Sequence, residues 1–243
     1  MLHEKCYVDV CALACRFFKL TVYYVRFADE EAEPYGYTCN GHVGIDIVLN
    51  NKRKNIVFPK NTILLDICLK NDEIKRREVL THEIMHYIES IVNAYPVEVL
   101  MMNDGSMEYD KYTEMMRKRE WRADVGASVL LLPKELVTNV YREQIGYDNL
   151  KVYGNSIFMA EDNMKLAKMA KFLKVSFDML VDRLYELDLL EKHNVSEFIR
   201  LTFGNEDRAM RKLSRYMRRC SNIKSLKTSI RNRQIRIELP PKS

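Results

Sequence analysis

The spacing of apolar residues predicts a chain that starts with a helix, continues as several short strands and then becomes mainly helical. Residues 3–18 carry apolar side chains at helical spacing, whereas Thr21–Phe27 is β-branched and aromatic, as strands are. Further strands are expected at residues 42–49, 56–58 and 62–66, with a loop at 29–36 and a polar turn at 50–54. This order predicts an α+β fold in which a small antiparallel sheet packs beside a helix.

The first long amphipathic segment follows the strands, and Asn71 or Asp72 can cap the helix that it predicts. At about 100° per residue, one side of this helix is apolar and the other polar. The apolar side carries Leu80, Ile84, Tyr87, Ile88 and Ile91, and the polar side carries His82, His86, Glu89 and Asn93. The helix is therefore predicted to bury one stripe and to present both histidines to a cleft.

The two histidines belong to the sequence Thr81-His82-Glu83-Ile84-Met85-His86, which has the pattern His-Glu-x-x-His. Four residues on a helix place both imidazoles on one face, so they can bind one metal ion, and Glu83 can reach a water on that ion. Chance is the alternative, since the pattern fixes only three positions. The chain has only five histidines, and two of them are here. We interpret the pattern as a zinc site.

A third ligand is expected from the helix predicted at residues 108–132, which Pro133 ends before starting the next helix. Glu120 and Asp124 lie one turn apart on this helix, beside small residues that allow another helix to approach. We predict that Glu120 binds the metal and that Asp124 accepts a hydrogen bond from a ligand imidazole. The alternative is a solvated pair on a highly charged helix. His42 could be a further ligand, but a strand residue is the favoured interpretation.

Residues 120–133 read EWRADVGASVLLLP, and this block resembles the one that follows the His-Glu-x-x-His helix in ImmA/IrrE-type metallopeptidases, a gluzincin-like family. The family pattern is close to E-x-[EQ]-A-[ND]-x-[FY]-A-x-x-L-L-[ML]-P. The resemblance covers about residues 40–190 and is strongest at 78–133. Arg122 replaces the usual Glu or Gln, and Gly126 replaces an aromatic residue, which leaves a gap that another side chain must fill.

The resemblance implies a bacterial or phage-related zinc endopeptidase that cleaves a helix-turn-helix transcriptional repressor and so derepresses stress-response or mobile-element genes. One zinc ion per chain, or manganese, would be held by His82, His86 and Glu120 and would activate a water. Glu83 would take the proton as the water attacks the peptide carbonyl. Tyr95, Tyr109 and Tyr112 are candidates for a second group that holds the oxyanion. The competing hypothesis is a regulator without protease activity that binds DNA or a repressor, with a structural or vestigial metal site.

The sequence divides into a predicted metallopeptidase domain at residues 1–145, a helix-turn-helix-like domain at 146–200 and a basic segment at 201–243. In the second domain Val175 is expected at the turn, Ser176 as a cap, and Leu180 and Leu184 on the buried face. The second helix of this pair is acidic, which favours a scaffold or repressor-docking role over DNA binding.

The net charge of +5 is unevenly distributed. Residues 208–236 contain eleven Lys or Arg and no acidic residue, so the rest of the chain nets 5 − 11 = −6. This basic segment can bind nucleic acid, but docking on an acidic partner or on the acidic body is favoured. No apolar run reaches the ~20 residues that span a bilayer, and the N-terminus is a poor signal peptide. We therefore expect a cytoplasmic protein that does not bind membranes.

Overall fold

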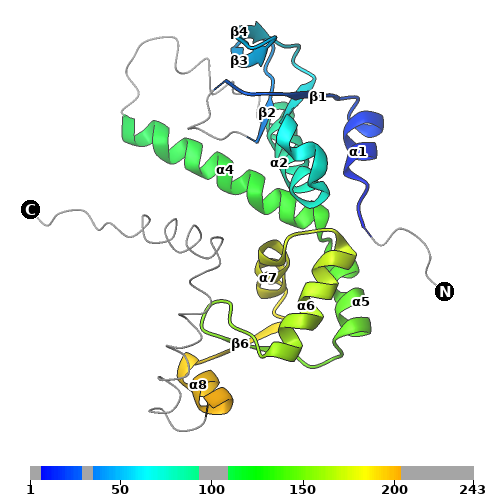
Figure 1. Ribbon diagram of the computed structural model, residues 1–243, viewed down its shortest axis with the longest axis vertical. Coiled ribbons are helices and arrows are strands. Elements are labelled where there is room, and N and C mark those ends of the chain that lie inside the picture. Colours follow the sequence, from blue (N-terminus) through cyan, green and yellow to red (C-terminus); the bar gives the residue numbers. More distant parts are fainter. Residues whose placement is uncertain (1–6, 29–34, 93–108, 204–243) are drawn as a thin grey trace, which may run out of the picture. The chain divides into compact units, whose positions relative to one another are not determined.

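The computed structural model describes residues 7–28, 35–92 and 109–203, the side chains of residues 109–113 and 203 excepted (Figure 1). The fold is α+β. The chain forms two compact units, the first made of residues 1–149 and 160–190 and the second of residues 150–159 and 191–243. The predicted domain borders at 145/146 and 200/201 stay predictions, and most of the predicted basic segment lies outside the described residues.

The N-terminal helix is much shorter than the predicted helix at residues 3–18. It comprises α1 (Val10–Ala12) and a π-helical turn, η1 (Leu13–Phe17). Asp9 ends the helix on its N-terminal side because its side chain accepts a hydrogen bond from the Ala12 N–H at 3.0 Å. Residues 3–6 lie outside the described residues.

A three-stranded sheet of order β1-β5-β2 consists of β1 (Thr21–Val25), β5 (Thr62–Asp66) and β2 (Gly36–Thr38). β2 pairs with β5 in antiparallel orientation, but β1 pairs with β5 in parallel orientation. The prediction of an antiparallel sheet is therefore wrong for β1. The physical reason is the long connection from β1 to β5, which returns the chain to the same end of the sheet. β2 was not predicted, and its first residue, Gly36, was assigned to the loop at residues 29–36.

A β-hairpin of β3 (Gly44–Leu49) and β4 (Lys52–Val57) turns at Asn50 and Asn51, whose φ angles are 53° and 57°. Positive φ at both central residues is the requirement of a two-residue type I′ turn, which asparagine tolerates. The second strand therefore starts at Lys52, inside the segment 50–54 that the sequence predicted as a turn. His42 lies in the bend before β3 and not in the strand.

β5 is the central strand, and the side chains of Thr62 to Leu65 are all buried. Leu64 joins a core cluster with Phe27, Cys39, Ile45 and Ile47. Side chains alternate along a strand, so Ile63 and Leu65 face the opposite side, where α2 (Glu73–Val92) packs against the strand. The sheet thus separates a small core below the hairpin from the core that holds α2.

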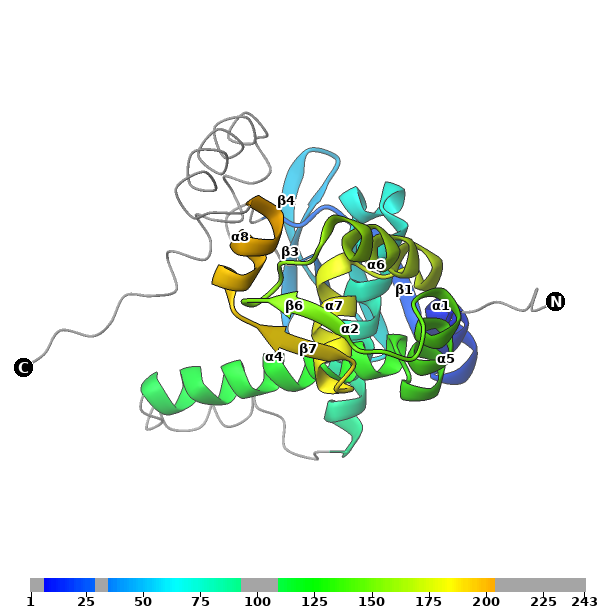
Figure 2. The same cartoon turned by 90° about the horizontal axis from the view of Figure 1, so that it is seen from below.

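The short η2 (Ile67–Asn71) leads into α2, and the side chain of Asp72 accepts a hydrogen bond from the Lys75 N–H at 2.9 Å. Asp72 is therefore the cap, as predicted. Leu80 and Ile84 are buried as predicted, but Ile91 is 56% exposed. α4 (Tyr109–Leu131) crosses α2 and is its main packing partner (Figures 1 and 2). Pro133 stands at the N-cap of α5 (Lys134–Gln144), one position before the predicted N1.

The predicted helix pair is α6 (Ala160–Leu173) and α7 (Phe177–Glu186), and both belong to the first unit. Val175, Leu180 and Leu184 are buried, and Ser176 caps α7 by accepting a hydrogen bond from the Met179 N–H at 3.2 Å. The local features of the predicted pair are confirmed. Its DNA-binding or docking role stays a prediction.

The remaining elements are β6 (Leu150–Tyr153), β7 (Leu190–His193) and α8 (Val195–Phe203). β6 and β7 form a two-stranded sheet (Figure 2), and the ring of Tyr153 packs against those of His193 and Phe198. Among the helices of the described ranges, none combines the length and the apolar character that crossing a bilayer requires.

Candidate metal centre

α2 and α4 run antiparallel, and their contact aligns the predicted site residues. His82 pairs with Asp124, whereas Glu89, farther along α2, pairs with Arg119 and Arg122, which come earlier in α4. Ala123 and Ala127 are buried between the helices. The small residues of α4 thus allow a close approach.

Glu89 fixes one end of this contact. Its carboxylate accepts a 2.8 Å hydrogen bond from Nε of Arg122, and its other oxygen lies 3.4 Å from Nε of Arg119. Arg122 is one of the two positions at which the sequence departs from the family pattern. Arg122 pairs with Glu89, which was predicted to lie on the polar face of α2 together with the two histidines.

Three possible ligand atoms converge between the two helices. Nε2 of His82 lies 2.9 Å from Nε2 of His86 and 3.1 Å from Oε2 of Glu120, and Nε2 of His86 lies 3.4 Å from Oε1 of Glu120. Tetrahedral bonds of about 2.0–2.1 Å to one zinc ion would separate the donor atoms by roughly 3.3 Å. The group formed by His82, His86 and Glu120 could therefore hold a metal ion.

Asp124 has the position predicted for it, with its Oδ1 2.9 Å from Nδ1 of His82. A carboxylate there keeps the proton on Nδ1, so that the neutral ring offers the lone pair of Nε2 to the centre. Burial lowers the pKa of His82, but the hydrogen bonds with Asp124 and Glu120 outweigh it and raise the pKa to about 10. Hydrogen bonds from His82 and His86 hold the pKa of Glu120 below its usual value.

The arrangement of His82, His86 and Glu120 is better satisfied by a bound metal cation than by protons on the ring nitrogens. His82 and His86 direct two ring nitrogens at each other, so one of these nitrogens must be protonated when no metal is bound. His86 is buried, and its Nδ1 has no hydrogen-bond partner among the described residues. Two imidazoles and one carboxylate at this spacing are a common ligand set of catalytic zinc, which leaves a fourth position for water.

Glu83 is 6% exposed and lies at the floor of the centre. The hydroxyl of Thr38 is 2.8 Å from Oε2 of Glu83 and 2.7 Å from its backbone oxygen. Burial raises the pKa of Glu83, and the nearby His86 and the Thr38 hydroxyl partly offset this increase. A carboxyl group with a raised pKa can take and return a proton near neutral pH.

Gly36 lets β2 approach Glu83. A Cβ at this position would lie 2.7 Å from Cγ1 of Val79 and 2.8 Å from Cγ of Glu83, closer than carbon atoms pack. Gly36 and Thr38 both face α2, whereas Tyr37 packs against the hairpin core on the other side of the sheet. A side chain larger than hydrogen at position 36 would push the strand or the carboxylate away.

The centre opens into a cavity of about 940 Å³. Its floor is α2, β2 forms one side, α4 forms the other, and α7 also lines it. The residues that line it include Tyr35, Gly36, Thr38, Lys75, Glu78, His82, Glu83, His86, Arg119, Glu120, Trp121, Asp124, Ser128, Met179, Asp182 and Glu186. The predicted cleft for the two histidines is thus present.

Every predicted site residue is part of this centre: His82, Glu83, His86, Glu120 and Asp124. His42 is not in the ligand group, and its N–H donates to Oδ1 of Asn40 at 2.8 Å. Tyr95 and the side chains of Tyr109 and Tyr112 lie outside the described residues. Sequence reasoning missed Gly36 and Thr38, and the only signal was a glycine and a threonine separated by Tyr37 at the end of a segment that reads as a loop.

The Gly126 departure is explained by Met85, whose side chain occupies the space where a side chain at position 126 would lie. The match to the family block is therefore compatible with the packing of α4 on α2. Comparisons of the sequence with models of known protein families and with curated proteins find no match, so membership in the ImmA/IrrE-type family stays a proposal.

Proposed function

We propose that the protein is a zinc-dependent endopeptidase whose catalytic centre is His82, Glu83, His86 and Glu120. One observation carries the proposal: three metal-binding side chains converge beside a buried carboxyl group, and all four line an open cavity. A structural zinc site would instead be closed by a fourth protein ligand.

His82, His86 and Glu120 would hold the zinc ion, and manganese is the alternative metal. When bound, the ion would supply the Lewis-acid chemistry that activates water and polarises a peptide carbonyl. Asp124 orients the His82 ring for this task, since it accepts the hydrogen bond from Nδ1.

Glu83 is the proposed general base and acid. It would take a proton from the attacking water and deliver it to the leaving amine. Burial favours the neutral form of Glu83, so the carboxylate is a stronger base than an exposed one. Thr38 holds Oε2 in place, which leaves Oε1 for the proton.

A free strand edge beside Glu83 supports an extended peptide as substrate. The backbone groups of Tyr35 and Cys39 are directed at β5, because Tyr35 O accepts from Asp66 N–H and Cys39 N–H donates to Thr62 O. The groups of Gly36 and Thr38, which alternate with them, face the other edge, which no described strand covers. A peptide can add to this edge through backbone hydrogen bonds.

The proposed substrate is a helix-turn-helix transcriptional repressor, whose cleavage would derepress stress-response or mobile-element genes in the cytoplasm. This part of the proposal rests on the resemblance of residues 78–133 to ImmA/IrrE-type metallopeptidases. The alternative is a regulator that binds DNA or a repressor without cleaving it.

Two measurements test the proposal. Metal analysis by mass spectrometry should find about one zinc per chain in the wild type and a large loss in Glu120→Ala. Zinc-loaded wild type and Glu83→Gln should then be incubated with the soluble proteins of the cells that produce the protein, and new N-termini identified. Glu83→Gln should retain zinc and produce no new N-termini. Equal cleavage by both proteins would refute the role of Glu83. No cleavage by either protein would favour the alternative, a regulator that binds DNA or a repressor without cleaving it.

A further inference from the structure

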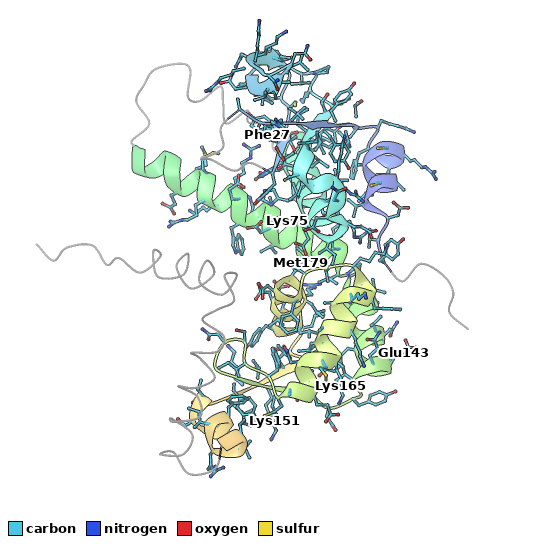
Figure 3. The ribbon with its side chains drawn as sticks, viewed as in Figure 1. Phe27, Lys75, Glu143, Lys151, Lys165 and Met179 are labelled. Carbon is cyan, nitrogen blue, oxygen red and sulfur yellow. The ribbon has the colours of Figure 1, made fainter. Side chains whose placement is uncertain are left out.

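α7 lines the cavity although it carries none of the candidate metal ligands, which lie on α2 and α4. Met179, Asp182 and Glu186 lie on one face of α7, at helical spacing, and line the cavity that holds His82 and Glu83. Met179 of α7 and Lys75 of α2 are both lining residues, and Figure 3 labels both side chains. α7 is therefore positioned to contact a bound substrate.

The turn between α6 and α7 is fixed to the N-terminal half of α2. The carboxylate of Glu78 accepts a hydrogen bond from the Ser176 N–H at 2.6 Å, and Nε of Arg77 donates to Lys174 O at 3.1 Å. Lys174 forms an ion pair with Glu73 at 2.7 Å. These contacts place the cavity-facing side of α7 near the N-terminal half of the helix that carries the histidines.

The cavity lining contributed by α7 and by the adjoining turn of α2 is acidic. Glu78, Asp182 and Glu186 contribute carboxylates, and Lys75 is the cation that lines this region. The ammonium of Lys75 lies over the ring of Tyr35, 4.9 Å from its centroid, on the β2 side. The other lining cation, Arg119, forms an ion pair with Glu89 at 3.4 Å. Lys75 and Arg119 thus have partners other than Asp182 and Glu186.

Glu186 retains capacity for a second cation. One of its oxygens accepts a 2.6 Å hydrogen bond from Nη1 of Arg183, but its side chain is 40% exposed. Asp182, one turn earlier, is also exposed, and its charge, together with burial as the larger cause, raises the pKa of Tyr185. A carboxylate can accept from two or more donors, so this pair can bind a guanidinium or ammonium group.

Ser128 supplies an independent sign of a ligand. It lines the same cavity from the C-terminal half of α4, it is 9% exposed, and its Oγ has no hydrogen-bond partner among the described residues. A buried hydroxyl without a partner is destabilising, and a ligand that bonds to it removes that destabilisation. An N–H of a cationic side chain can donate to it.

We propose that Ser128, Asp182 and Glu186 form a subsite for a Lys or Arg side chain of the substrate, next to the scissile bond. The subsite rests on the proposed peptidase function and deepens it by naming the substrate class. Arginine fits best, because its planar group has five donors in a fixed arrangement and can serve two carboxylates and a hydroxyl together.

The first test measures cleavage of peptide pairs that differ only in Arg or its neutral isostere citrulline, placed at each position around the scissile bond. At one position the wild type should prefer Arg by about fivefold or more in kcat/KM, the effect of one partly exposed charge pair. The ratio should fall to about one in Asp182→Asn/Glu186→Gln. Asp178→Asn removes one negative charge from α7 at a residue that does not line the cavity, and it should keep the ratio.

The second test measures binding without cleavage. Trp121, the single tryptophan of the chain, lines the cavity, so its fluorescence reports occupancy. Zinc-loaded Glu83→Gln should bind acetyl-Ala-Arg-Ala-amide more tightly than the citrulline peptide at low salt. The added substitutions Asp182→Asn and Glu186→Gln should abolish that difference.

The two tests separate the two proposals. Cleavage with no preference for Arg at any position, or equal binding of both peptides, would overturn the subsite and leave the peptidase function standing. A preference for Arg in binding, with no cleavage of any peptide or protein by the wild type, would support the subsite and overturn the peptidase function.

Discussion

Met85 of α2 lies where a side chain at position 126 of α4 would lie, and Gly126 is therefore the residue that makes room. A Cβ at position 126 would be 3.1 Å from both Sδ and Cγ of Met85 and closer still to its terminal methyl group. The methionine occupies the space that a side chain at position 126 would fill, and an aromatic residue is usual at this position in the family that the sequence resembles. The two positions should consequently tolerate only paired changes.

This pairing predicts that Gly126→Leu destabilises the protein by up to about 2 kcal/mol. Overpacking costs about 1–3 kcal/mol, and loss of the helical glycine returns about 1 kcal/mol. Met85→Ala in the same chain should recover most of this loss, because the two side chains compete for one space. Urea unfolding of the four proteins of the cycle measures the coupling. Additive effects would show that the two side chains do not compete.

The hydroxyl of Thr38 should matter for the reaction and not for metal binding. Thr38→Val removes a hydrogen bond to Glu83, worth about 1.5 kcal/mol or more when the acceptor is charged, and should lower kcat/KM about tenfold. That hydrogen bond also lowers the pKa of Glu83, so its loss should shift the acid limb of the pH–rate profile to higher pH. Thr38→Ser retains the hydroxyl and is the control. A loss of zinc from Thr38→Val would contradict this assignment.

Metal binding should release a proton at neutral pH. In the metal-free protein the hydrogen bonds with Asp124 and Glu120 outweigh burial and raise the pKa of His82 to about 10, so His82 is protonated at pH 7. Zinc requires the neutral imidazole. The apparent zinc affinity should therefore rise with pH, by about tenfold per pH unit for one proton, until the pH approaches the pKa of His82.

Calorimetry in two buffers of different ionisation enthalpy counts the protons released. Asp124→Asn removes the charged acceptor, which should lower the pKa of His82 and reduce the release. The same change should weaken zinc binding about tenfold or more, as losses of carboxylate partners of ligand histidines do. Glu114→Gln, on the same helix but paired with Lys118, is the matched control. A zinc affinity that does not change with pH would exclude a protonated His82.

Arg77 should hold the α6–α7 turn on α2. It is 6% exposed and donates to two backbone carbonyls, those of Val8 at 2.9 Å and Lys174 at 3.1 Å. Arg77→Leu would leave both partly buried acceptors without this donor and should cost about 2–4 kcal/mol. Arg76→Leu is the control, because Arg76 donates to Lys70 O at an exposed position. Amide exchange in α7 should accelerate in Arg77→Leu alone.

The three candidate metal ligands were predictable because each depends on a local pattern. His82 and His86 are one helical turn apart, and so are Glu120 and Asp124, so the sequence brings each pair to one face without knowledge of the fold. The packing of α2 on α4 then needs only small residues at positions 123 and 127, which the sequence displays. The predicted apolar stripe was less accurate at the C-terminal end of α2, where Ile91 is exposed.

The place of Thr38 in the site, and the cavity-lining face of α7 with Met179, Asp182 and Glu186, were not predictable from local patterns. β2 has three residues, begins with Gly36, and exists because Tyr37 pairs with Leu64 far along the chain. The amphipathic pattern of α7 places Leu180 and Leu184 inside, but the destination of its acidic face depends on the contact of Ser176 with Glu78, 98 residues away. Such pairings are decided by tertiary packing, which propensity does not encode.

The chain passes between the two compact units three times, after residues 149, 159 and 190. The segment that carries α6 and α7 is therefore covalently joined to the second unit at both of its ends. A shortened chain that stops at residue 149 would keep His82, His86 and Glu120 and lose the face of α7 that lines the cavity. Mechanical tension on the second unit would reach this face of α7 through two covalent links, whereas the three candidate metal ligands precede both links in the chain.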